Sequence, residues 1–377
     1  MKVLHLIHGT AVGGVETAAA HLQATLRGSA RPVATEAPEE QKAEEIDYRV
    51  AALEASPPED AALEADVVGS GVNSPRSAVR ILALIRRHRP DVLVTSLWRS
   101  MALGYLARLV GWRGTWAIWV HNSRFTNPVD RLVHRWTLPR ADLILCDSIA
   151  AREELVDPML CDLGAETPTV LVRPDAPALL SGPRERPVAE EPLHLVSWGR
   201  IAPQKRLDRA LDLLAELDAR RPAGARLTLV GPDGGSLGAL REEITARGLT
   251  DRVRIFGTMD REGLAEVVAT SDVFVLTSAF EGYGMSAHEA LAAGFVSVLS
   301  PVGDLAADTH DGRDTLHFCG DAVRAVDRLL ALEADPAAWS ALARRAREVR
   351  TTSMTGDFVR ACRSARTSAP DRSRVAA

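Results

Sequence analysis

Two acidic residues, Glu281 and Glu289, frame a glycine-containing loop in the second half of the chain. The loop follows the apolar run 273–277 and precedes the run 290–294, a pattern that predicts a strand, a turn and a short helix closed by glycine. The unpaired N–H groups and the dipole of a helix N-terminus attract an anion. The loop is therefore a candidate site for a nucleotide sugar, whose diphosphate is anionic.

A structural explanation of the same residues is also open. Ser286 and Glu289 have the S-x-x-E spacing of a capping box, and Glu281 would then be a solvated loop acid. Such short motifs often arise by chance, so other loops of the chain must decide between the two explanations.

A loop in the second half carries basic residues where a strand gives way to a helix. It runs Trp198-Gly-Arg-Ile-Ala-Pro-Gln-Lys-Arg206 and contains Gly199, Arg200 and Lys205. Cations at a helix N-terminus oppose the helix dipole, and a bound diphosphate would explain their presence. The alternative is the ordinary scatter of Arg and Lys over surface loops. The glycines at 231–235 predict a turn rather than a contact.

Two loops of the first half also follow predicted strands, whose carboxyl ends form the usual binding edge of such sheets. One contains Gly13 and Gly14, which would let a phosphate or sugar approach the backbone, or would form only a tight turn. It does not fit G-x-G-x-x-G, which disfavours a dinucleotide-dependent dehydrogenase. The other carries His121, although a lone histidine after a strand is more often structural.

The elements that position these loops alternate between strand and helix in both halves. The 377 residues are 46% hydrophobic and 25% charged, which is typical of a globular protein of two or three domains. Repeated strand and helix signals predict parallel sheets. We therefore expect an α/β protein with two Rossmann-like domains, 1–175 and 193–362, facing across a central cleft. The proline-rich segment 176–192 would link them, the last helix could pack back on the first domain, and 363–377 would form a flexible tail.

Several protein classes are disfavoured by the remaining features. The four cysteines are widely spaced without a C-x-x-C pair, so neither a zinc site nor a disulfide framework is indicated. The first residues predict a strand rather than a signal peptide, and no apolar run has the length of a membrane span. These features favour the cytoplasm.

The stretch 76–140 is strongly basic within a chain of net charge −5. It holds twelve arginines against two acids, together with five of the seven tryptophans. Arginine and tryptophan together are typical of a protein that attaches peripherally to an anionic membrane face or grips an anionic acceptor. The alternative is that the tryptophans pack in the core and the arginines are solvated.

The segments S-W-G-R-I-A-P-Q-K, L-V-G-P-D-G, V-R-I-F-G and E-x7-E follow one another within 196–300. In this order they resemble the GT-B glycosyltransferases, and among them the retaining family four (glycosyl transferases group 1), over both domains. The resemblance implies transfer of a hexose from a UDP- or GDP-linked donor to a hydroxyl of a glycan or lipid-linked acceptor. It also implies a role in cell-surface polysaccharide or glycolipid biosynthesis, with no metal, other cofactor or nucleic acid. The alternatives are a nucleotide-sugar epimerase on the same fold and a catalytically degenerate binding subunit.

The resemblance also implies roles for individual residues. Arg200 and Lys205 would bind the donor diphosphate, Glu281 the donor-sugar hydroxyls, Glu289 the nucleotide ribose, and His121 would approach the sugar. The other residues expected at the donor are Gly13, Gly14, Gly199, Tyr283, Gly284, Met285 and Ser286.

Overall fold

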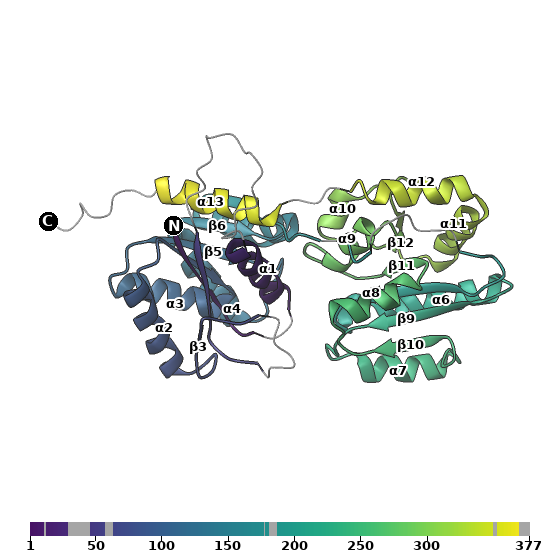
Figure 1. Ribbon diagram of the computed structural model, residues 1–377, viewed down its shortest axis with the longest axis horizontal. Helices are drawn as coiled ribbons and strands as arrows, with labels where there is room; N and C mark the ends of the chain where they lie inside the picture. The colour runs from purple at the N-terminus through teal and green to yellow at the C-terminus, as the bar shows by residue number, and fades with distance from the viewer. Residues whose placement is uncertain are drawn as a thin grey trace. The chain divides into compact units, whose positions relative to one another are not determined.

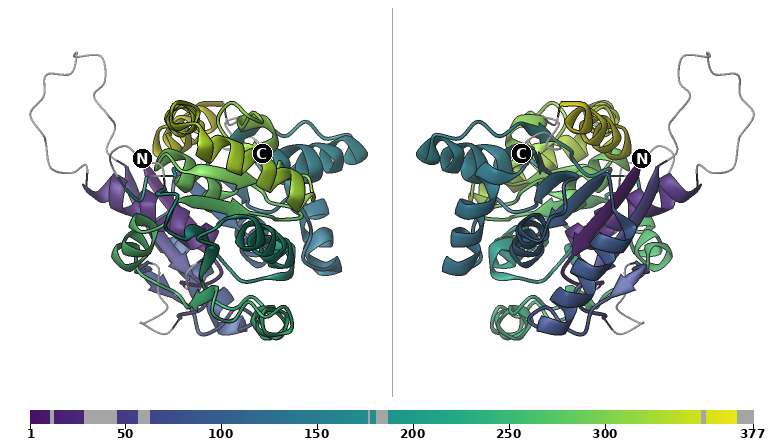
Figure 2. Two further views of the ribbon diagram at one scale, coloured as in Figure 1. Left: turned by 90° about the vertical axis from the view of Figure 1, so that its right-hand side faces the viewer. Right: turned by 90° about the vertical axis from the view of Figure 1, so that its left-hand side faces the viewer.

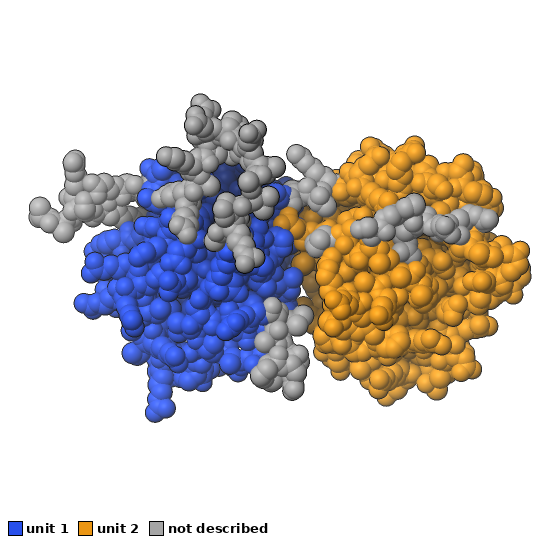
Figure 3. All heavy atoms as spheres, in the orientation of Figure 1, with its two compact units in different colours: residues 1–174, 352–377 blue, residues 175–351 orange. Residues whose placement is uncertain are grey.

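The computed structural model describes residues 1–10, 13–28, 46–56, 63–176, 178–180, 187–349 and 353–368. The chain divides into two compact units, coloured in Figure 3. Unit 1 comprises Met1–Pro174 and Thr352–Ala377, and unit 2 comprises Asp175–Thr351. Each unit has its own parallel sheet with helices on both faces (Figures 1 and 2), so the expected pair of Rossmann-like domains is confirmed.

Unit 1 contains a seven-stranded parallel sheet in the order β3-β2-β1-β4-β5-β6-β7. The strands are β1 Lys2–Ile7, β2 Asp47–Ala52, β3 Val67–Val68, β4 Val92–Ser96, β5 Thr115–Val120, β6 Leu143–Cys146 and β7 Thr169–Leu171. The central strands β4, β5 and β6 are buried along their whole length, because helices cover both faces of the sheet.

Helices on the two faces of this sheet bury separate apolar clusters. One face is covered by α1 (Gly14–Gly28) and by α13 (Met354–Ser368), which returns from the end of the chain. The other is covered by α2 Pro75–His88, α3 Trp98–Leu109, α4 Pro128–Thr137, the 3-10 turn η2 Leu138–Arg140, the π-helical segment η3 Ala151–Val156 and α5 Asp157–Leu163. The start of α4 follows from its sequence, because the Asn127 side chain accepts from Asp130 N and Pro128 occupies the first turn.

Unit 2 contains a six-stranded parallel sheet in the order β10-β9-β8-β11-β12-β13. The strands are β8 Leu193–Trp198, β9 Ala225–Val230, β10 Val253–Phe256, β11 Val273–Leu276, β12 Val296–Leu299 and β13 Leu316–His317. The helices are η4 Pro203–Lys205, α6 Leu207–Arg220, α7 Leu237–Ala246, α8 Arg261–Ala269, α9 Met285–Ala292, α10 Asp304–Asp308, α11 Ala322–Ala334 and α12 Pro336–Ala346. Because β8 and β11 are neighbours, their carboxyl ends lie side by side.

The described parts of the segment between the predicted domains pack onto unit 2. Leu179 and Leu180 contact the apolar cluster around Phe274, and the Arg221 guanidinium donates to Val188 O at 2.8 Å. At the other end of unit 2, the chain returns to unit 1 as α13. This helix continues to Ser368, beyond the predicted domain end at 362, because its apolar residues fill the cluster against α1. Residues 369–377 of the expected tail lie outside the described residues.

Among the described residues, no helix combines the length and the apolar character needed to cross a bilayer.

Candidate donor site and the residues of unit 1

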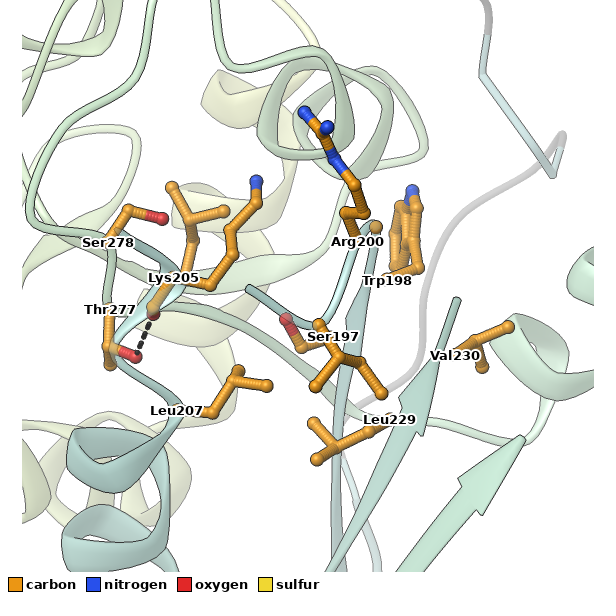
Figure 4. Close-up of a pocket in the computed structure, with 12 residues that line it drawn as sticks. Ser197, Trp198, Arg200, Lys205, Leu207, Leu229, Val230, Thr277 and Ser278 are labelled. Atoms are coloured by element: carbon orange, nitrogen blue, oxygen red, sulfur yellow. Dashed lines mark hydrogen bonds between the residues drawn. The ribbon is translucent and has the colours of Figure 1, made fainter. Parts of the chain in front are cut away.

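Two loops meet at the carboxyl ends of β8 and β11. The loop after β8 carries Arg200 and Lys205, and the loop after β11 carries Glu281. Thr277 joins them, because its hydroxyl donates to Lys205 O at 3.3 Å (Figure 4) and to Arg206 O at 2.9 Å. Ala279 N adds a bond to Gln204 O at 2.8 Å. The main chain around the lysine is thus held by the loop that carries the acid.

Lys205 and Glu281 form an ion pair at this edge of the sheet. Lys205 Nζ lies 2.7 Å from Glu281 Oε1, which also accepts from the Ser278 hydroxyl at 2.6 Å. The two charged side chains are 16% and 13% exposed, so a ligand can reach the pair. Arg200 is exposed and forms no ion pair within the part of the chain that the structure describes. In Figure 4 the nitrogen ends of Lys205 and Arg200 point to the same side.

Glycines allow the loop after β8 to lie against its neighbour. Gly199 has φ +123°, and a Cβ on Gly231 would lie 2.1 Å from Gly199 O. Ile201 N donates to Pro232 O at 2.9 Å, and Gly234 N donates back to Ile201 O at 2.8 Å. The glycines at 231–235 therefore form a supporting turn, as the sequence predicts.

The loop after β11 ends at the N-terminus of α9. Gly284 is the N-cap residue with φ 78°, in the left-handed region that favours glycine. Ala287 and His288 donate the first bonds of the helix to Gly284 O, so the amides of Met285 and Ser286 precede them at the anion-attracting end. Tyr283 is buried and stacks on His288 with ring centroids 4.0 Å apart.

The capping-box explanation of Ser286 and Glu289 is wrong. Ser286 lies inside α9, and no side chain caps this helix. The Glu289 carboxylate, on α9, instead accepts a hydrogen bond from the indole Nε1–H of Trp198, at the end of β8, over 2.8 Å. Burial raises the pKa of Glu289, an effect that the Trp198 hydrogen bond partly offsets. A carboxylate held in this way can accept a hydrogen bond from a hydroxyl of a bound ligand through its remaining lone pairs.

The remaining predicted site residues belong to unit 1. Gly14 begins α1, and a Cβ on Gly13 would lie 2.5 Å from the Glu16 carboxylate, so the missing side chain makes room for that acid. His121 follows β5 and lines a cavity of about 230 Å³ with His8, Arg99 and Arg124. Both of its ring nitrogens contact the protein: Nε2 lies 2.9 Å from Ser96 Oγ, and Nδ1 lies 3.2 Å from Asp147 Oδ2.

Sequence reasoning missed three partners of the predicted residues. Trp198 holds Glu289, Ser278 holds Glu281, and Asp147 holds His121. A signal existed for each, because Trp198 ends a strand, and Ser278 and Asp147 lie within two residues of a strand end. The Trp198–Glu289 and Asp147–His121 contacts depend on the order of the strands in each sheet, and that order cannot be deduced from one sequence.

Solved structures with similar backbones define the class of this fold. The structure of Anabaena HepE in complex with UDP has a TM-score of 0.68 at 16% identity and covers 97% of this chain and 98% of its own. Sucrose-phosphate synthase from Thermosynechococcus elongatus has a TM-score of 0.70 at 18% identity, covering 97% of both chains. The two Rossmann-like units thus form a GT-B fold.

Sequence comparisons give the family. Residues 183–349 match the profile of Glycosyl transferases group 1, and residues 13–162 match that of the Glycosyl transferase 4-like domain. The chain therefore belongs to the group 1 glycosyltransferases, and the resemblance of its motifs is confirmed.

Curated relatives match over only part of their length. The 2-deoxystreptamine N-acetyl-D-glucosaminyltransferase of Streptomyces fradiae is 30% identical over 294 residues, 65% of this chain and 65% of its own. The mannosylfructose-phosphate synthase of Agrobacterium fabrum is 31% identical over 128 residues, 32% of this chain and 28% of its own. The matched part is thus less than two thirds of either relative.

Proposed function

We propose that the protein transfers a hexosyl group from a UDP- or GDP-linked donor to a hydroxyl acceptor. The observation that carries this proposal is the Lys205–Glu281 pair, held 2.7 Å apart beside the N-terminus of α9. It offers a cation and helix amides to a diphosphate and a carboxylate to sugar hydroxyls. Family membership supports the proposal, as does the bound UDP of the structural neighbour HepE.

The chemistry proposed is substitution with retention at the anomeric carbon. The bond from this carbon to the leaving phosphate oxygen breaks first, and Arg200, Lys205 and the amides of Met285 and Ser286 stabilise the charge that develops on the diphosphate. The acceptor oxygen then attacks the same face of the sugar, and its proton passes to the leaving phosphate. Because fixed cations take up the charge, we propose that turnover needs no metal ion.

The direct test incubates the purified protein with a panel of UDP- and GDP-sugars. A donor that binds the native state should raise the melting temperature with its concentration. Slow release of UDP or GDP in the presence of EDTA, with the anomeric configuration of the freed sugar resolved by NMR, tests turnover, metal independence and retention. Epimerised donor without nucleotide release would show an epimerase, and binding without either reaction would show a degenerate binding subunit.

We further propose that unit 1 attaches to an anionic membrane surface, where it would meet a lipid-linked acceptor for polysaccharide or glycolipid synthesis. The five tryptophans of the stretch 76–140 support membrane attachment less than the sequence suggests. Trp116 and Trp119 are fully buried, and only Trp136 among the five is more than half exposed. The support comes from α2, which contains no acid. Arginines 76, 80, 86, 87 and 89, on this helix and its cap, are exposed and form no ion pair with any described residue.

Apolar side chains are exposed on the same face of the sheet. Val129, Leu132 and Trp136 of α4 are 51%, 56% and 52% exposed and follow helical spacing. The helix α3 lies between α2 and α4 and contacts both. Basic residues and an exposed apolar stripe on one face of a sheet suit the headgroup region of an anionic bilayer.

A further inference from the structure

A continuous chain of side-chain hydrogen bonds runs through the core of unit 1 to His121. Tyr48 Oη lies 2.7 Å from His5 Nδ1, His5 Nε2 lies 2.8 Å from Ser96 Oγ, and Ser96 Oγ lies 2.9 Å from His121 Nε2. His121 Nδ1 lies 3.2 Å from Asp147 Oδ2. Tyr48, His5 and Ser96 are at most 1% exposed, so water does not take part in these contacts.

The carboxylate at one end orders the protons of the whole chain. Asp147 can only accept, and its other oxygen accepts from the Ser148 hydroxyl at 2.9 Å, so His121 Nδ1 must carry the proton. The unprotonated Nε2 of a neutral His121 then accepts from the Ser96 hydroxyl. Ser96 Oγ in turn accepts from His5 Nε2–H, and His5 Nδ1 accepts from the Tyr48 hydroxyl.

The reverse order fails at both ends. His121 Nδ1 would then face the Asp147 carboxylate with a lone pair unless the ring carried two protons. The Tyr48 hydroxyl proton would have no acceptor among the described residues. His5 cannot relieve the conflict by charging, because burial, together with the neighbouring His121, lowers its pKa to about 3.

Aromatic packing fixes the rings in this chain. Trp119 stacks on His5 with ring centroids 5.6 Å apart and lies 5.0 Å from the His121 ring. Phe358 of α13 covers Trp119 at 5.5 Å and Tyr48 at 5.9 Å. The returning helix thus closes the apolar surroundings of the chain (Figure 1).

We propose that Tyr48, His5, Ser96 and Asp147 are positioning residues for His121, holding its ring in the Nδ1–H tautomer at the wall of the 230 Å³ cavity. The functional part rests on the proposed sugar transfer, in which His121 meets the substrate. Because both ring nitrogens are engaged, a substrate meets a ring edge of fixed orientation rather than a mobile imidazole. Residues that only fix the orientation of another side chain can raise the rate of a reaction without touching the reacting atoms.

The tautomers can be measured directly in the full-length protein labelled with 15N-histidine. Long-range 1H–15N spectra at pH 7 should show opposite tautomers, Nδ1–H for His121 and Nε2–H for His5. Asp147→Leu should lower the fraction of His121 in the Nδ1–H form, because the acceptor of that proton is removed. A doubly protonated His121, or an Nε2–H tautomer of His121 in the unmodified protein, would overturn the proposal.

A matched pair of serine variants tests the positioning role. Ser96 and Ser100 are both 0% exposed, but Ser100 Oγ has no hydrogen-bond partner among the described residues. Ser96→Ala should shift the ring signals of His5 and His121 and lower kcat by about tenfold with an unchanged donor KM. Ser100→Ala should do neither. Equal effects of the two changes would refute the role, whereas normal tautomers in a protein without turnover would refute the proposed function alone.

Discussion

The Lys205 ammonium is paired with the Glu281 carboxylate at 2.7 Å. Their loops are joined through Thr277 and Ala279, so contacts within the chain hold the two loops that carry these side chains. Such preorganisation lowers the reorganisation needed when charge develops on a leaving group. It also means that a diphosphate meets a lysine whose charge is partly balanced, which leaves Arg200 as the less compensated cation of the site.

The first prediction concerns the two cations. Lys205→Ala and Arg200→Ala should each lower donor turnover by about a hundredfold, because each removes charge that stabilises the leaving diphosphate. Arg200→Ala should leave the melting temperature unchanged, since Arg200 is exposed and forms no ion pair with a described residue. Arg209→Ala, a change at a nearby basic position on α6, serves as the control. Full activity in both site variants would remove the diphosphate assignment.

The second prediction separates the two glutamates. Glu281→Gln should weaken discrimination among sugars on one nucleotide, whereas Glu289→Gln should weaken binding of UDP and GDP whatever sugar is attached. The reason is their placement on either side of the α9 N-terminus, with Glu289 fixed by Trp198. Titration calorimetry with nucleotides and nucleotide sugars measures both. Equal loss of affinity for every ligand in both variants would contradict the division.

Stability should respond to Glu289→Gln in the opposite sense to binding. The pKa of this carboxyl is raised by burial, so the stability that it contributes is present at acidic pH and is lost as pH rises through the folded-state pKa. Glutamine can still accept from Trp198 without that penalty. At pH 7.5 the variant should therefore melt no lower than the unmodified protein, and its advantage should shrink towards pH 4. A lower melting temperature at pH 7.5 would contradict this account.

The pH dependence of unit 1 should reveal the buried His5. Its pKa is about 3 in the folded protein against 6.5 in an unfolded chain, so the stability due to neutral His5 is complete above pH 6.5 and is lost as pH falls towards 3. The loss approaches about 1.4 kcal/mol per pH unit for one proton. His5→Gln should be less stable at pH 7.5, and the difference should narrow between pH 6.5 and pH 5. A constant difference across this range would show that His5 does not titrate on unfolding.

Local patterns were sufficient to predict most strands of both sheets, because parallel strands are continuous apolar runs bounded by turn residues. The strand β2 escaped this approach, since Asp47, Tyr48 and Arg49 break its apolar run. The motif loops also pointed to Lys205 and Glu281, but their contact depends on β8 and β11 being neighbours. Trp116 and Trp119 could not be placed from the sequence either. Their clustering with Trp136 and the arginines suggested a membrane-facing surface, whereas their position in the central strand β5 buries them in the core.

The last prediction concerns membrane attachment through α2 and α4. Each arginine near an anionic surface contributes about 1 kcal/mol, and interfacial Trp136 adds anchoring. Sedimentation with liposomes of graded anionic-lipid content should therefore show binding that rises with lipid charge and falls with salt. Arg76→Glu combined with Arg80→Glu should abolish it, and Trp136→Ala should weaken it at every salt concentration. The matched control combines Arg226→Glu with Arg254→Glu, exposed arginines on strands of unit 2 that likewise form no ion pair with a described residue. Binding that ignores lipid charge, or equal loss in both double variants, would contradict docking through this face and favour a soluble acceptor.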